Sequence, residues 1–162
     1  MASKREKDMK ARHADSGGIL KPLDPLSLDN QLCFPLYAAS REVVKLYRPH
    51  LDEIGLTYTQ YITLMVLWEH GEMTVKGLGE RLFLDSGTLT PVVKALEEKG
   101  LVKRERSADD ERVVVVKLLP AGQDLRARAT AVPEKVGACI NLQPEEAMQL
   151  YYLLHKVLED VR

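Results

Sequence analysis

The sequence lacks both a long apolar run and a strong net charge. No stretch of about 18 apolar residues, the length needed for a helix to cross a bilayer, occurs among the 162 residues. We therefore expect a soluble protein with no membrane partner. The first residues mix basic and acidic side chains and lack the apolar core of a signal peptide, which predicts a cytoplasmic location.

The formal net charge of -1 excludes a protein that binds nucleic acid through overall electrostatic attraction. Any DNA contact must depend on a local basic group, which the sequence offers in Lys99, Lys103, Arg104, Arg106 and Arg112. Acidic residues are interleaved with this group. Charge alone therefore does not predict DNA binding.

Cysteine is scarce, because the chain has only Cys33 and Cys139. Two distant cysteines in a chain predicted to be intracellular argue against a structural disulfide framework, and leave either a redox role or plain packing. Residues with the spacing of metal ligands are also missing. We expect neither a metal nor another cofactor.

Hydrophobic periodicity predicts a mainly helical chain with one small β-hairpin. Short turns join the three central helices, as in a helix-turn-helix, and two β-rich runs follow directly, which makes a winged helix. Helices are expected over about 28–47, 57–70, 75–84 and 86–99, extended runs over 101–106 and 113–118, and further helices opening at Pro120 and Pro144. Pro35 fits the first helix only near its start, and a break is expected around Pro49.

The elements suggest three regions. Residues 1–26, rich in glycine, proline and polar side chains, are expected to form a mobile tail. Residues 49–119 form the winged helix-turn-helix, while 27–48 and 120–162 form helices whose apolar faces exceed what that small domain can cover. We expect these helices to pair with a second copy. A two-fold homodimer would set two recognition helices about 34 Å apart on a pseudo-palindromic duplex.

The helix that begins near Ser86 is the expected recognition helix. Ser86, Thr88, Thr90 and Lys94 offer polar side chains to base edges, and the first backbone amides could bind phosphate. Thr88, Thr90 and Pro91 could also contact the methyl group of thymine.

The hairpin would place a second set of contacts. Asp110 and Arg112 are two residues apart, so we expect them to share one face of a strand, with the carboxylate holding the guanidinium toward the minor groove. Arg106, at the end of the first extended run, is also an expected DNA contact. The alternative for Asp110 and Arg112 is a solvated surface ion pair of little energetic value.

Cys33 lies on the apolar face of the first predicted helix, near its start. The positive end of the helix dipole favours the thiolate there, although most such cysteines are inert small hydrophobes. Tyr37 follows one turn later on the same side. Tyr47 lies about 21 Å along the axis, so it could meet Cys33 only across an antiparallel dimer. Without a dimer, both rings would be ordinary core aromatics.

Four runs of sequence resemble the MarR family of winged-helix regulators, and specifically its organic hydroperoxide resistance branch. These runs are NQLCFPLYAASREV, YTQYITLMVLWEH, LDSGTLTPVVKALEEKGLVKR and DDERVVVVKL, and the resemblance covers residues 28–160. It implies a dimeric repressor, not an enzyme, that organic hydroperoxides release from DNA. It also implies that Cys33 is the sensing thiol and that Tyr37 and Tyr47 of opposite subunits hydrogen-bond it.

The branch has forms with one and with two cysteines, and Cys139 lies where the two-cysteine form needs its second thiol. The resemblance thus implies that Cys33 becomes a sulfenic acid and then forms an intersubunit disulfide with Cys139. The alternative for Cys139 is a core cysteine without a role. Two other functions stay open at this stage, namely a MarR-like repressor that binds a phenolic ligand and a thiol peroxidase.

Overall fold

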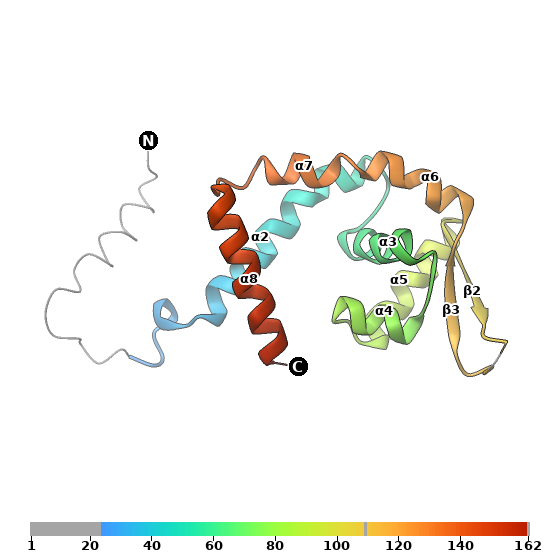
Figure 1. The fold of residues 1–162 in the computed structure, drawn as a ribbon, viewed down its shortest axis with the longest axis horizontal. Helices are drawn as coiled ribbons and strands as arrows, with labels where there is room; N and C mark the ends of the chain where they lie inside the picture. The colour runs from blue at the N-terminus through green and yellow to red at the C-terminus, as the bar shows by residue number, and fades with distance from the viewer. Residues whose placement is uncertain (1–23, 109, 162) are drawn as a thin grey trace, which may run out of the picture. The chain divides into compact units, whose positions relative to one another are not determined.

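The computed structural model describes residues 24–108 and 110–161 and divides the chain into two units, residues 1–42 and 43–162. Most of the predicted N-terminal tail lies outside the described residues. Along the chain (Figure 1) the elements are η1 (Leu28–Asn30), α2 (Cys33–Asp52), α3 (Tyr58–His70), β1 (Glu72–Thr74), α4 (Val75–Leu82), α5 (Ser86–Glu98), β2 (Val102–Arg106), β3 (Val114–Leu118), α6 (Pro120–Ala129), α7 (Val132–Gly137) and α8 (Pro144–Asp160).

The first unit contains η1 and the start of α2. Because α2 begins at Cys33, Pro35 falls in its first turn, where a missing N–H leaves no helical hydrogen bond unmade. The predicted break at Pro49 is wrong, since α2 continues through that residue to Asp52. Leu51, in the same last turn, is 1% exposed, so its burial holds the turn in place despite the proline. The chain turns instead at Gly55, whose φ is 72°.

Helices α3, α4 and α5 form the helix-turn-helix of the second unit, as the sequence predicts. Its core includes five leucines with 0% exposure, namely Leu64, Leu67, Leu78, Leu89 and Leu96. The turn between α4 and α5 is closed by a hydrogen bond from the Leu84 backbone N–H to the Gly79 carbonyl, 2.9 Å long. A Cβ at Gly79 would lie only 2.7 Å from the Leu84 carbonyl oxygen, so this position needs glycine.

Side chains cap the three helices at their N-termini. Thr57 and Gln60 form a capping box at α3, Thr74 caps α4 by accepting from the Gly77 backbone N–H, and Asp85 caps α5. These local bonds fix where each helix begins.

The wing is a three-stranded antiparallel sheet in the order β1-β3-β2. Strands β2 and β3 are the two predicted runs, pairing from Val102 opposite Leu118 to Arg106 opposite Val114. The third strand, β1, was not predicted, because three residues after a helix carry no readable alternation. The mainly helical fold with a small wing is confirmed.

Helix α6 lies close to Leu101, the residue that precedes β2. A Cβ on Gly122 would lie 2.2 Å from the Leu101 carbonyl oxygen, so glycine allows the helix to approach. The indole N–H of Trp68 on α3 donates to the Gly122 carbonyl at 2.9 Å, which ties α3 to α6. Pro120 and Pro144 open α6 and α8 as predicted. No described helix combines the length and apolarity that a membrane crossing requires.

Candidate nucleic-acid interface and thiol sites

Asp85 organises the N-terminus of the recognition helix α5. Its carboxylate accepts the Thr88 backbone N–H at 2.8 Å and the Thr88 hydroxyl at 3.1 Å. These hydrogen bonds hold the pKa of Asp85 below its usual range, so the group is ionised at neutral pH. The Thr88 amide, one of the predicted phosphate donors, is therefore already bound by the protein's own carboxylate.

The five predicted contacts on α5 are all solvent-exposed. Burial of the opposite side of α5, at Leu89 and Val93, turns these residues outward. The exposed residues are Ser86, Thr88, Thr90, Pro91 and Lys94. Packing of the helix thus presents the residue set that the sequence indicates.

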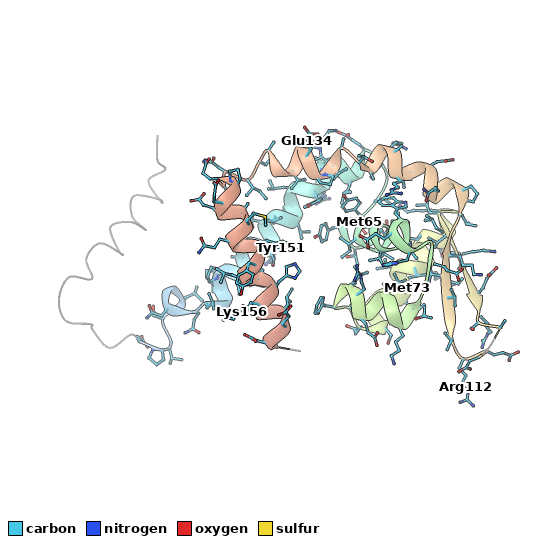
Figure 2. All side chains as sticks on the ribbon, in the orientation of Figure 1. Met65, Met73, Arg112, Glu134, Tyr151 and Lys156 are labelled. Atoms are coloured by element: carbon cyan, nitrogen blue, oxygen red, sulfur yellow. The ribbon has the colours of Figure 1, made fainter. Side chains whose placement is uncertain are left out.

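The tip of the wing differs from the prediction. Asp110 and Arg112 lie in the turn between β2 and β3, not on a shared strand face. The Asp110 carboxylate accepts the Arg112 backbone N–H at 2.9 Å, so it shapes the turn and does not hold the guanidinium. Arg106 donates to the Glu111 carbonyl at 2.7 Å and braces the same turn. Figure 2 shows the Arg112 side chain projecting from the wing tip.

One open groove joins the recognition helix to the wing. It has a volume of about 630 Å³ and brings Ser86 and Thr90 of α5 together with Arg112. Its lining also includes Arg104, a member of the predicted basic group, and Lys76, which the sequence did not point to. The other predicted contacts are outside this lining, namely Thr88, Pro91, Lys94, Arg106 and Asp110.

Cys33 is exposed and is the first residue of α2. The first turn of that helix contains no acidic residue. Tyr37 is also exposed, one turn further on. The Tyr37 hydroxyl oxygen accepts a 2.9 Å hydrogen bond from Arg41, whose guanidinium lies 5.5 Å from the ring centre. That bond leaves the phenol proton of Tyr37 able to donate elsewhere.

Tyr47 belongs to the second unit and packs there against other aromatic rings. Its ring contacts Tyr58 edge-on at 5.0 Å between centroids and Tyr61 at 6.0 Å. Burial, together with the neighbouring Tyr47, raises the pKa of Tyr58, so this phenol keeps its proton. Sequence reasoning missed Tyr58, because a contact between α2 and α3 leaves no trace in helical spacing.

Cys139 follows α7 and is also exposed. Its thiol donates to the Lys135 carbonyl, with the sulfur 3.4 Å from the oxygen. Both cysteines are free thiols at the surface of the chain, so the alternative in which they are buried in its core is wrong.

Comparisons with known proteins found similar transcriptional regulators. Residues 45–127 match the family model described as Transcriptional regulator SarA/Rot. The chain is 46% identical over 136 residues to the organic hydroperoxide resistance transcriptional regulator of Bacillus subtilis, covering 84% of this chain and 92% of that protein.

Solved structures of AbfR from Staphylococcus epidermidis are also similar. Reduced AbfR bound to DNA has a TM-score of 0.70 and 33% identity, covering 96% of both chains. AbfR with its disulfide formed has a TM-score of 0.57 and 32% identity, covering 98% of this chain and 96% of that one. AbfR has also been solved overoxidised and bound to DNA.

Proposed function

The chain belongs to the SarA/Rot family of MarR-like winged-helix transcriptional regulators, and on this premise we propose that it is a homodimeric repressor that organic hydroperoxides release from DNA. Its duplex target would be a pseudo-palindrome, and its place of action the cytoplasm. The observation that carries the proposal is the exposed thiol of Cys33 at the first position of α2. The thiol peroxidase alternative is set aside, because the relatives and the fold are those of regulators, not enzymes.

The first chemical step is oxidation of Cys33. Its sulfur attacks the terminal oxygen of a hydroperoxide, the O–O bond breaks, and an alcohol leaves while Cys33 becomes a sulfenic acid.

Phenol groups would hold the reactive sulfur. Tyr37 is one helical turn from Cys33 and has its proton free, because Arg41 donates to its oxygen. We assign Tyr47 of the partner subunit as the second donor. Tyr58 touches Tyr47 and stays protonated, so it is a third candidate that the same sulfur would meet.

Exposed apolar side chains at both ends of the chain support the homodimer. Around the start of α2, Leu32 is 72% exposed and Phe34 is 42% exposed. On α8, Tyr151 and Tyr152 are 61% and 66% exposed, and no residue of this helix is buried. Apolar surface of this extent is a mark of a protein interface. Pairing of these segments between two copies would cover it.

Cys139 would complete the switch. Its thiol attacks the Cys33 sulfenic acid of the partner subunit, a disulfide forms, and water leaves. A disulfide requires Cα atoms within about 7 Å, so closing it would pull the helices of the dimer into one fixed arrangement. The two recognition helices would then lose their spacing of about 34 Å and with it the DNA.

The test is a DNA-binding titration of the reduced chain before and after cumene hydroperoxide, run beside non-reducing electrophoresis. We expect wild type to lose DNA and to migrate as a covalent dimer. Cys33→Ser should stay bound and uncrosslinked, while Cys139→Ser should form a sulfenic acid without a covalent dimer. Release of Cys33→Ser by peroxide would contradict the proposal. Release of that variant by a phenol alone would instead favour the ligand-binding alternative.

A matched pair of tyrosine variants tests the phenols. Tyr47→Phe should bind DNA normally when reduced but react more slowly with peroxide, because a donor to the sulfur is lost. Tyr152→Phe removes a phenol from the proposed dimer surface of α8 that is not assigned to the sulfur, and should react at the wild-type rate. Equal rates for both variants would mean that Tyr47 does not hydrogen-bond the Cys33 sulfur.

A further inference from the structure

The outward face of α5 is poor in hydrogen-bond donors. Opposite the buried residues Leu89 and Val93, the helical repeat places Gly87 and Pro91 at the centre of the exposed arc. Glycine has no side chain, and proline has neither a polar side chain nor a backbone N–H. These two positions therefore offer surface for van der Waals contact and no side-chain donor.

The two threonines that flank this centre have committed their hydroxyl protons. The Thr90 hydroxyl donates to the Ser86 carbonyl at 2.6 Å, and the Thr88 hydroxyl donates to the Asp85 carboxylate at 3.1 Å. Each hydrogen bond also fixes the side-chain rotamer, because threonine is branched at Cβ. What remains for DNA on each exposed threonine is a γ-methyl group and an oxygen lone pair.

Of the residue types that read the other bases by paired hydrogen bonds, α5 has only Lys94. Guanine is read by arginine or lysine, and adenine by asparagine or glutamine. Helix α5 has no arginine, asparagine or glutamine. Its one basic residue, Lys94, lies 3.8 Å from the Glu98 carboxylate one turn later.

From this inventory we infer that Thr88 and Thr90 are the specificity-determining residues of α5, and that they select thymine by packing their γ-methyl groups against its C5 methyl. Thymine is the one base whose major-groove edge presents a methyl group. The operator half-sites are then defined by the positions of thymines along the groove. The inference deepens the DNA-binding role of the chain and does not depend on its response to peroxide.

The experiment uses the full reduced chain and a duplex that it selects from a pool with a randomised centre. Each thymidine of the selected duplex is replaced in turn by deoxyuridine, which keeps the base pair and removes only the methyl group. We expect the contacted positions to bind about fourfold more weakly, the effect of one buried methyl group. Undiminished binding at every substituted position would overturn the inference.

Paired variants identify the residue that reads each methyl. Thr90→Ser keeps the hydroxyl and loses the methyl group, so it should no longer distinguish thymidine from deoxyuridine at its position. Thr90→Val loses the hydroxyl and keeps the methyl, so it should retain the distinction. The same pair applies to Thr88. If the valine variants lose the distinction and the serine variants keep it, the hydroxyl reads the base and the inference is wrong.

Thr130→Ser is the control. Thr130 is exposed and its hydroxyl donates to the Arg126 carbonyl, the same local bond that Thr90 makes, but it lies at the end of α6. This variant should leave both affinity and discrimination unchanged. The thermal unfolding midpoint of every variant shows whether a change in binding comes from unfolding or from a lost contact with the base. Because only reduced protein is assayed, failure of the peroxide response would leave this result intact.

Discussion

Glu97 on the recognition helix α5 binds Arg104 on strand β2 with both oxygens of its carboxylate. One oxygen accepts the Arg104 backbone N–H at 2.8 Å, and the other accepts Nε at 2.8 Å and lies 2.6 Å from Nη2. These bonds lower the pKa of Glu97, so it is ionised at neutral pH. Because β2 is the first strand of the hairpin, this pair fixes the wing against the recognition helix.

Replacing this carboxylate should therefore loosen the wing. In Glu97→Gln one oxygen can still accept, but the charge is lost and the other oxygen is replaced by an NH2 group that cannot accept. We expect DNA affinity to fall roughly twofold to fivefold, as for a partly exposed ion pair. Hydroxyl-radical footprinting should show the loss concentrated where we propose that the wing contacts the minor groove.

Glu98→Gln provides the comparison on the same helix. Glu98 pairs with Lys94 at 3.8 Å, and within the described part of the chain no hydrogen bond or ion pair joins it to the wing. Its replacement should leave the footprint of the wing unchanged. A Glu97→Gln protein with full protection by the wing would show that the Arg104 pair does not position it.

Acid should destabilise the winged helix-turn-helix by protonating three of its carboxylates. Hydrogen bonds from Thr88 lower the pKa of Asp85 from 3.8, and those from Arg104 and from neighbouring lysines lower the pKa values of Glu97 and Glu105 from 4.5. A lowered folded-state pKa contributes stability above the unfolded pKa, and that stability is lost as pH falls through the folded value. We expect the urea midpoint to be steady at neutral pH and to fall below about pH 4.5.

Asp85→Asn tests how much of this pH dependence comes from Asp85. The amide oxygen can still cap α5, but the residue no longer titrates. The fall in urea midpoint between neutral and acidic pH should be smaller than for wild type. An identical acid profile would mean that Asp85 contributes nothing to the pH dependence.

Gly122→Ala should strongly destabilise the fold. The added Cβ would lie 2.2 Å from the Leu101 carbonyl oxygen, a backbone atom, so α6 must move away from the wing. That shift also strains the Trp68 hydrogen bond to the Gly122 carbonyl. We expect a loss of roughly 1–3 kcal/mol in the free energy of unfolding, measured in urea. Gly137→Ala, with nothing within 4 Å of its Cβ, should unfold like wild type.

Local signals in the sequence were enough to predict most helix boundaries. Gly71 ends α3 with a φ of 75°, while Thr74 and Asp85 cap the next two helices through bonds that span only three residues. Prolines at the first position of α6 and α8 act in the same local way. Bonds of this kind depend on neighbours in the chain and can therefore be read from it.

Contacts made through tertiary packing could not be read in this way. Pro49 is kept in a helix by the burial of Leu51, which no local rule anticipates. The Asp110 carboxylate binds a backbone N–H in a turn, whereas strand alternation predicted a pair of side chains. The Glu97 to Arg104 pair joins a helix to a strand, so only the folded arrangement reveals it.

Arg112 should dominate the salt dependence of DNA binding. Four lysines near the recognition helix and the wing already pair with carboxylates, at 2.6 Å for Lys103, 3.2 Å for Lys117, and 3.8 Å for Lys76 and Lys94. Arg106 donates to the Glu111 backbone carbonyl within the wing turn. Within residues 24–108 and 110–161, the Arg112 guanidinium makes no ion pair, and it projects from the wing tip (Figure 2).

Arg112→Ala should lower the slope of log affinity against log salt by about one per subunit, because one released counterion is lost. Lys117→Ala should leave that slope near the wild-type value, since its charge is already neutralised by Glu105 and Glu72. Equal changes in slope for the two variants would mean that Lys117 binds DNA phosphates despite its ion pairs within the sheet.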